Sequence, residues 1–170
     1  MSNKKAKRRE QFLVFVALLL FALLSPLMIA VVVAAILFYV LSALCLYVAV
    51  WFCWCRRGRS VLFVYSDSPI WREYVEERIL PRLGERAVVL NWSQRKRWRG
   101  TLPVLVFRFF GGSRDFNPLA VVFRPLRFAR RFRFHEPFRE YKHGKTESLA
   151  RMERELFELV DEVQGPGGMN

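Results

Sequence analysis

The stretch that decides the architecture is residues 12–55, which read FLVFVALLLFALLSPLMIAVVVAAILFYVLSALCLYVAVWFCWC. It contains 44 residues and no charged side chain. An α-helix crosses the hydrocarbon layer of a bilayer, which is ~30 Å thick, in about 20 residues. The stretch is therefore long enough for two crossings. It excludes an ordinary soluble protein, a disordered chain and a disulfide-rich secreted miniprotein.

Two clusters of basic residues flank this stretch, and they are Lys4, Lys5, Lys7, Arg8 and Arg9 before it and Arg56, Arg57 and Arg59 after it. Lys and Arg near membrane spans favour the cytoplasmic side, so both clusters are expected there, and this requires an even number of crossings. We therefore predict a transmembrane helical hairpin, with helices at approximately 12–30 and 34–55. The predicted location is the inner or plasma membrane, with both termini cytoplasmic.

Two other membrane arrangements fit part of the pattern. Pro26, in the only break of the apolar run, lies 14 residues after Phe12, and about 21 Å of helix is short of a full crossing. A re-entrant hairpin and a single span therefore remain alternatives. The run far exceeds the apolar region of a cleavable signal peptide. All three cysteines, Cys45, Cys53 and Cys55, lie inside it. The rest of the chain has no cysteine, which agrees with a reducing cytoplasm around it.

Outward from the apolar stretch, the chain divides into a basic cytoplasmic N-terminus (1–11), an α/β domain (56–164) and a disordered tail (165–170). Short apolar runs predict strands at 60–65, 87–90 and 119–123, and the alternation at 131–134 fits an edge strand. Helical spacing predicts a helix that starts at Pro69 behind the N-cap Ser68, a helix at 101–112, and a terminal helix capped by Thr146.

The order of these elements predicts the fold of the domain. Apolar strands that alternate with helices are typical of a parallel sheet covered on both faces. Because crossover connections are right-handed, we predict a small Rossmann-like or flavodoxin-like domain behind the hairpin.

Open parallel sheets bind ligands at the carboxyl ends of their strands. The polar and basic residues that follow the predicted strands form the candidate ligand site: Ser66, Asp67, Ser68, Asn91, Ser93, Arg95 and Arg124. The chain has no glycine-rich phosphate loop, and its two histidines, His135 and His143, form no metal-binding pair with a cysteine. The sequence therefore predicts no metal site and identifies no cofactor and no catalytic residue.

The chain is strongly basic, with 28 Lys and Arg against 15 Asp and Glu and a net charge of +13. This charge is concentrated in residues 95–133, where Asp115 is the only acidic residue. The segment contains eleven basic residues: Arg95, Lys96, Arg97, Arg99, Arg108, Arg114, Arg124, Arg127, Arg130, Arg131 and Arg133. Arginine makes bidentate contacts to phosphate and stacks on aromatic rings. The candidate anionic-lipid face is formed by Arg127, Arg130, Arg131 and Arg133.

These patterns favour a membrane-anchored binding or adaptor module that contacts anionic lipid headgroups. The alternative is a membrane-associated enzyme acting on a phosphorylated or nucleotide-linked substrate. In that case Asp67 would serve as base or metal ligand, and Arg95 or Arg124 would clamp the anion. Nucleic acid is the least favoured partner, since no recognised binding motif accompanies the arginines.

Overall fold

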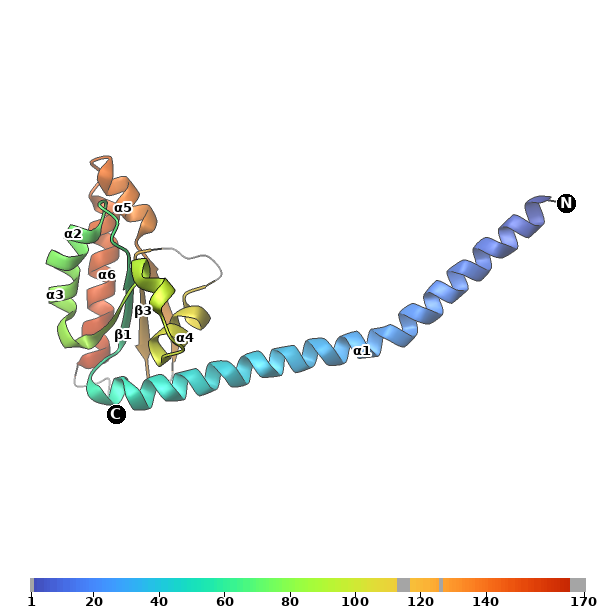
Figure 1. Cartoon of the computed structure of the whole chain (residues 1–170), viewed down its shortest axis with the longest axis horizontal. Helices are drawn as coiled ribbons and strands as arrows, with labels where there is room; N and C mark the ends of the chain where they lie inside the picture. The colour runs from blue at the N-terminus through green and yellow to red at the C-terminus, as the bar shows by residue number, and fades with distance from the viewer. Residues whose placement is uncertain (1, 113–116, 126, 166–170) are drawn as a thin grey trace. The chain divides into compact units, whose positions relative to one another are not determined.

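The structure is a computed structural model that describes residues 2–112, 117–125 and 127–165. It divides into two compact units, Met1–Leu44 and Cys45–Asn170 (Figure 1). The second unit begins before the predicted domain boundary at residue 56. Of the predicted tail at 165–170, all but Gly165 lies outside the described residues.

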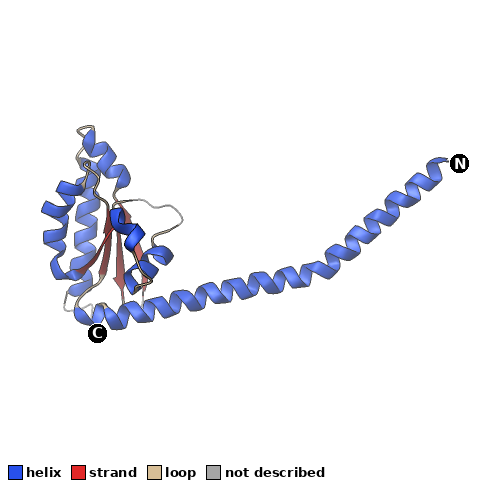
Figure 2. Cartoon of the chain, in the orientation of Figure 1, coloured by secondary structure: helices blue, strands red, loops and turns tan. Residues whose placement is uncertain are grey.

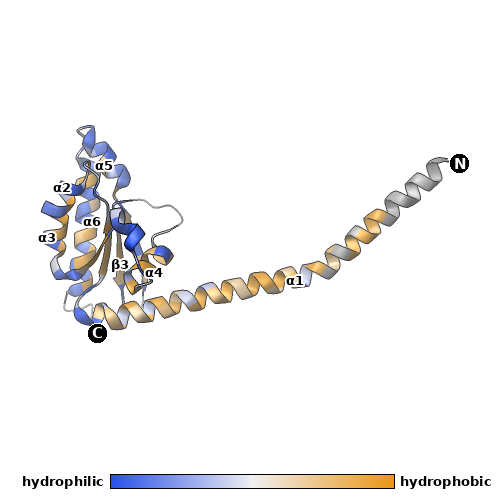
Figure 3. Cartoon of the chain, viewed as in Figure 1, coloured by the Kyte–Doolittle hydropathy of each residue, from blue (hydrophilic) through white to orange (hydrophobic). Residues whose placement is uncertain are grey.

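The apolar stretch forms one continuous helix, α1 (Ser2–Cys53), in place of the predicted hairpin with helices at 12–30 and 34–55. The residues expected to turn, 31–33, are Val-Val-Val and include no turn-forming residue, so the backbone hydrogen bonds continue through them. Pro26 lies inside the helix and removes one backbone donor without ending it. Apolar residues follow one another along α1 (Figure 3). Among the described residues, Leu24–Arg57 is the one stretch long and apolar enough to cross a membrane.

The second unit is built on a four-stranded sheet of β1 (Val61–Tyr65), β2 (Ala87–Asn91), β3 (Leu119–Arg124) and β4 (Arg127–Arg133). The strand order is β2-β1-β3-β4. The β1 and β2 strands are parallel, whereas β3 is antiparallel to both β1 and β4. The sheet is therefore mixed, and the Rossmann-like or flavodoxin-like parallel topology is not what the chain adopts.

The direction of β3 follows from the connection before it. Helix α4 (Leu102–Phe110) ends near the start of β1, because the Phe110 ring lies 5.4 Å from the Phe123 ring and the Phe123 amide donates to Ser60 O. The next strand nevertheless begins at Leu119, which pairs with Val64 near the other end of β1. Eight residues separate α4 from β3, and such a segment extends up to about 26 Å, enough to return along a five-residue strand.

Most of the predicted elements are present. The strands at 60–65, 87–90 and 119–123 and the edge strand at 131–134 correspond to β1, β2, β3 and β4, and the helix at 101–112 corresponds to α4. The terminal helix is α6 (Glu147–Gln164). The helix predicted from Pro69 begins later and consists of α2 (Arg72–Tyr74), the π-helical η2 (Val75–Ile79) and α3 (Leu80–Leu83). Short 3-10 turns are η1 (Cys55–Arg57), η3 (Gly84–Arg86) and η4 (Trp92–Arg97), and α5 (His135–Lys142) was not predicted.

One face of the sheet is covered by α2 to α3, α5 and α6 (Figure 2). Alternate β1 side chains, Val61, Phe63 and Tyr65, point into this layer. They pack there against buried residues of these helices, which include Val75, Ile79, Leu83, Phe138, Leu156 and Val160.

The other face is covered by α4 and by the last turns of α1. Leu62 and Val64 of β1 pack there with Val106, Phe107 and Phe123. Val50 is completely buried in this core and Trp54 is 6% exposed. Residues 45–54 therefore belong to the globular unit, although they continue an apolar helix.

Candidate functional site

The parallel pairing of β1 with β2 brings together three of the predicted site residues. The Asp67 amide donates to Ser93 Oγ (2.9 Å), Asn91 Nδ2 donates to Asp67 Oδ1 (2.8 Å), and the Ser93 amide donates to Asn91 Oδ1 (2.9 Å). Each of these residues bonds to both of the others. The cluster therefore joins the loops that follow the two strands, and its polar groups are largely used for that purpose.

The two flanking serines are also hydrogen-bonded within the loop. Ser66 Oγ accepts from Trp71 Nε1 (3.3 Å), and Ser68 Oγ accepts from the Ile70 amide (3.4 Å). The helix expected directly after Ser68 begins at Arg72, and Trp71 occupies its N-cap position. The prediction that Ser68 caps this helix is therefore wrong.

Tyr65, the last residue of β1, lies beside this cluster. Its hydroxyl donates to Glu76 Oε1 (3.1 Å), and Glu76 also pairs with Arg72 (3.2 Å). Burial raises the pKa of the Tyr65 phenol above its ordinary value. The hydrogen bond to Glu76 and the negative charges of Glu76 and Asp67 raise this pKa further, and the Arg72 charge opposes them. The phenol therefore acts as a neutral hydrogen-bond donor at this end of the sheet.

Arg124 lies at the opposite end of the sheet, because β3 is antiparallel to β1. Its Nη2 donates to the carbonyl of Phe128 (3.0 Å), across the turn into β4. Its Nε is buried and has no hydrogen-bond partner. The predicted role of Arg124 as an anion clamp beside Ser66, Asp67 and Ser68 is therefore wrong.

Three aromatic rings form a compact group next to the polar cluster, on the α4 side of the sheet. Trp92 and Trp98 lie at the two ends of η4, and Phe107 comes from the buried side of α4. Each pair of rings has its centroids 5.6 Å apart in an edge-to-face arrangement. Such contacts stabilise the position of η4 against α4 beyond the burial of apolar area.

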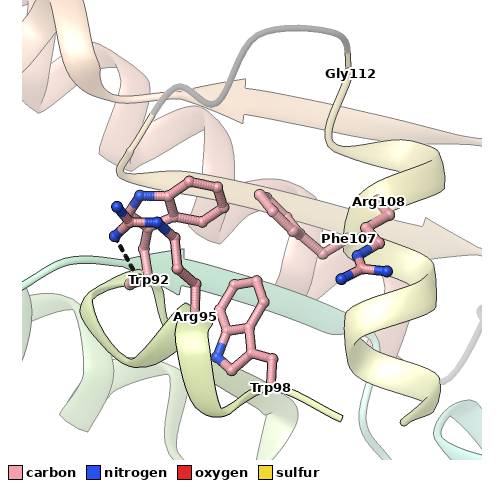
Figure 4. A pocket seen from close by; sticks show the side chains of 6 residues that line it. All are labelled: Trp92, Arg95, Trp98, Phe107, Arg108 and Gly112. Carbon is pink, nitrogen blue, oxygen red and sulfur yellow. Dashed lines mark hydrogen bonds between the residues drawn. The ribbon is translucent and has the colours of Figure 1, made fainter. Parts of the chain in front are cut away.

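A shallow depression of about 340 Å³ opens over these rings (Figure 4), and it is lined by Trp92, Arg95, Trp98, Phe107, Arg108 and Gly112. The Arg95 guanidinium lies 5.1 Å from the centre of the Trp92 ring, and its Nη1 donates to the Trp92 carbonyl (3.4 Å). Arg108 enters from α4. The six lining residues include two arginines and no acid, so the depression favours an anion beside an apolar surface.

Two further arginines, from β4, lie beside Gly112, which lines the depression. Gly112 has a φ of +98°, and a Cβ at this position would lie 3.1 Å from Arg133 Nη2 and 3.3 Å from Arg131 Nη1. The absence of a side chain at Gly112 thus allows two guanidinium groups to converge there. We call Arg95, Arg108, Arg131 and Arg133 the basic rim.

The predicted lipid face of four β4 arginines is divided between the two sides of the sheet. Arg130 forms a salt bridge with Glu155 of α6 (2.7 Å), and Arg127 lies 3.8 Å from Glu162 of the same helix. Arg131 and Arg133 alternate with residues that face α6, and so they lie on the α4 side. The four side chains therefore do not form one surface. Arg114, from the same basic segment, lies outside the described residues.

Sequence reasoning identified Arg95, Arg131 and Arg133 but missed the aromatic group and Gly112. The available signal was the pair of tryptophans six positions apart with arginines between them. Within 2–112, 117–125 and 127–165, no group of three or more His, Cys, Asp or Glu side chains is placed to hold a metal ion. No known family model, curated protein or solved structure matches the chain.

Proposed function

We propose that the protein is a membrane-anchored binding module. Helix α1 lies in a bilayer, and the basic rim of the globular unit holds anionic lipid headgroups on the cytoplasmic side. The observation that carries this proposal is the convergence of Arg131 and Arg133 on Gly112, which lines the depression together with Arg95 and Arg108.

The exposure of α1 supports the anchor. Large apolar side chains between 24 and 44 are open to the surroundings, with Leu24 55%, Ile36 56% and Phe38 75% exposed. Contact with water costs about 25 cal/mol for each Å² of apolar surface, and a bilayer removes this cost. The segment 24–44 is about 30 Å long as a helix, which equals the thickness of the hydrocarbon layer.

The attachment of α1 to the globular unit supports lipid as the source of the anion. The Ala129 amide of β4 donates to the Tyr47 hydroxyl (2.8 Å), and the Tyr47 ring lies 4.9 Å from Phe110 of α4. Ala129 precedes Arg131 by two residues, and Phe110 precedes Gly112 by two. The last turns of α1 thus contact α4 and β4, two of the three elements that supply the basic rim.

The chemistry of the rim suits a phosphate-bearing headgroup. Arginine offers paired donors to phosphate oxygens. Anionic lipids are concentrated in the cytoplasmic leaflet, where each Lys or Arg near the surface contributes about 1 kcal/mol. This distribution favours a cytoplasmic globular unit.

Arginine footprinting of the full chain in lipid nanodiscs tests the proposal. Phenylglyoxal modifies accessible arginines, and mass spectrometry locates the products. We expect Arg131 and Arg133 to react less in nanodiscs with anionic lipid than in neutral ones, while the exposed Arg139 of α5 reacts equally in both. Equal reactivity of the rim in both lipids would contradict the proposal. Protection by a soluble phosphorylated compound in neutral nanodiscs would favour the enzyme alternative.

A further inference from the structure

Phe128 in β4 is an exposed aromatic residue that no core of the protein uses. It is 86% exposed, more than any other large apolar side chain among the described residues. It also lies on an edge strand of the sheet, next to the turn from β3. Covering this ring with another apolar surface would be favourable, by about 25 cal/mol for each Å² removed from water.

The backbone around Phe128 is held on both sides. Its carbonyl accepts from Arg124 Nη2 (3.0 Å), and the next amide, that of Ala129, donates to the Tyr47 hydroxyl (2.8 Å). The exposed ring is therefore presented by an ordered strand that is bonded directly to α1.

The bond to Tyr47 places the backbone next to Phe128 close to the end of the segment that we propose to lie in the membrane. Tyr47 follows Leu44, the last residue of the apolar unit, by three residues, or about 4.5 Å of helix. The interfacial layer on each side of the hydrocarbon is roughly 5–7 Å thick. When 24–44 fills the hydrocarbon layer, Tyr47 lies in the interfacial layer, and Phe128 is adjacent to its hydrogen-bonded partner Ala129.

The neighbouring residues suit the same environment. Aromatic residues are enriched at membrane interfaces, and arginine reaches the headgroups. The side chain of Arg127, the residue before Phe128, is 66% exposed.

We infer that Phe128 inserts into the interfacial layer of the bilayer that α1 enters and forms a second membrane contact. This inference rests on the proposed anchoring by α1. Lipid is the partner that covers the Phe128 ring, because the hydrogen bond between the Ala129 amide and the Tyr47 hydroxyl holds this part of β4 against the end of α1.

Photocrosslinking of the full chain in nanodiscs tests the inference and needs no change to the native cysteines. Phe128 is replaced with p-benzoyl-phenylalanine, which resembles phenylalanine and needs no buried space at so exposed a site. The same replacement at Val89, which is 42% exposed on the opposite edge strand β2, is the matched control. The replacement at Ile36, in the middle of the apolar helix, reports on the anchor itself.

We expect lipid adducts at positions 128 and 36. At position 89 we expect only the background level of adducts. Adducts at Ile36 with Phe128 at the background of Val89 would overturn the inference and leave the anchor intact. Background at all three positions would overturn the anchor and the inference together. A crosslinked dimer through Phe128 without lipid adducts would show that a second copy covers the ring, and this would also overturn the inference.

Discussion

The division of the β4 arginines between two sides of the sheet predicts that their substitutions have unequal effects. We compare two double variants, Arg131→Gln with Arg133→Gln, and Arg127→Gln with Arg130→Gln. Both variants remove two positive charges from the same strand. They differ in that Arg127 and Arg130 pair with acids of α6, whereas Arg131 and Arg133 converge on Gly112.

The expected magnitude follows from the rim. Each arginine at an anionic surface contributes about 1 kcal/mol, so loss of Arg131 and Arg133 should weaken binding by about 2 kcal/mol, or roughly thirtyfold. Substitution of Arg127 and Arg130 should weaken binding by only a few-fold, since their charges are already opposed by Glu162 and Glu155.

Co-sedimentation of residues 45–170 with vesicles measures these effects. The fragment begins at Cys45 because Val50 and Trp54 belong to its core. Binding should require anionic lipid and should weaken as salt rises, since the screening length falls from about 8 Å at physiological ionic strength to about 3 Å at 1 M. Thermal unfolding of both variants controls for the fold.

Equal losses in the two double variants would show that net charge alone attracts the protein, and the reasoning from the rim would be refuted. Undiminished binding by the Arg131 and Arg133 variant would refute it more directly. Binding to neutral vesicles as strong as to anionic ones would show that the exposed aromatic residues, and not the arginines, dominate.

Three further predictions concern topology, packing and pH. Because α1 is continuous, cysteines placed at Ser2 and Ser148 should be labelled from opposite faces of the membrane; labelling from one face would show the hairpin that the charge pattern predicts. Trp54→Ala should lower the free energy of unfolding by about 3–5 kcal/mol in thermal or denaturant unfolding, and a loss below 1 kcal/mol would mean that α1 does not complete the core. Burial, with the hydrogen bond to Glu153, raises the pKa of Tyr74 above its ordinary value of 10.0. The folded chain then keeps a proton that the unfolded chain loses, so stability should fall as pH rises above about 10, and less steeply in Tyr74→Phe; equal slopes would contradict this assignment.

The elements of the globular unit could be predicted because their patterns are local. Residues 61–65 are apolar at every position and are buried on both faces of the sheet. The helix at 102–110 forms as its apolar spacing predicts, although its buried side consists of Val104, Val106 and Phe107, and Leu105 is 44% exposed. The proximity of Asp67 to Asn91 followed from the parallel pairing of two consecutive strands.

The direction of β3 could not be predicted, because it depends on the length of chain after α4 and on no residue pattern. The rule that places basic clusters on one side of a membrane favoured an even number of crossings, but it contains no information on whether the backbone can turn. In this chain the predicted turn contains no turn-forming residue, and the helix continues through it.

The candidate site could not be predicted from the sequence for a different reason, since its residues come together only in the folded structure. The acids that pair with Arg127 and Arg130 lie at positions 162 and 155 on α6, seven residues apart and so on one side of that helix. Their partners become visible only when the helix is packed on the sheet. Gly112 is likewise the last residue of the helix predicted at 101–112. In the fold it leaves space for the guanidinium groups of Arg131 and Arg133.

The burial of Val50 and Trp54 has a consequence for how the protein can be processed. A protease that cut between Trp54 and β1 would detach these side chains together with the apolar helix α1 and would expose Leu62 and Val64 to water. Proteolytic shedding at that point would yield an aggregation-prone fragment. A soluble form could arise only by cleavage before Cys45, where the cut leaves the sheet covered.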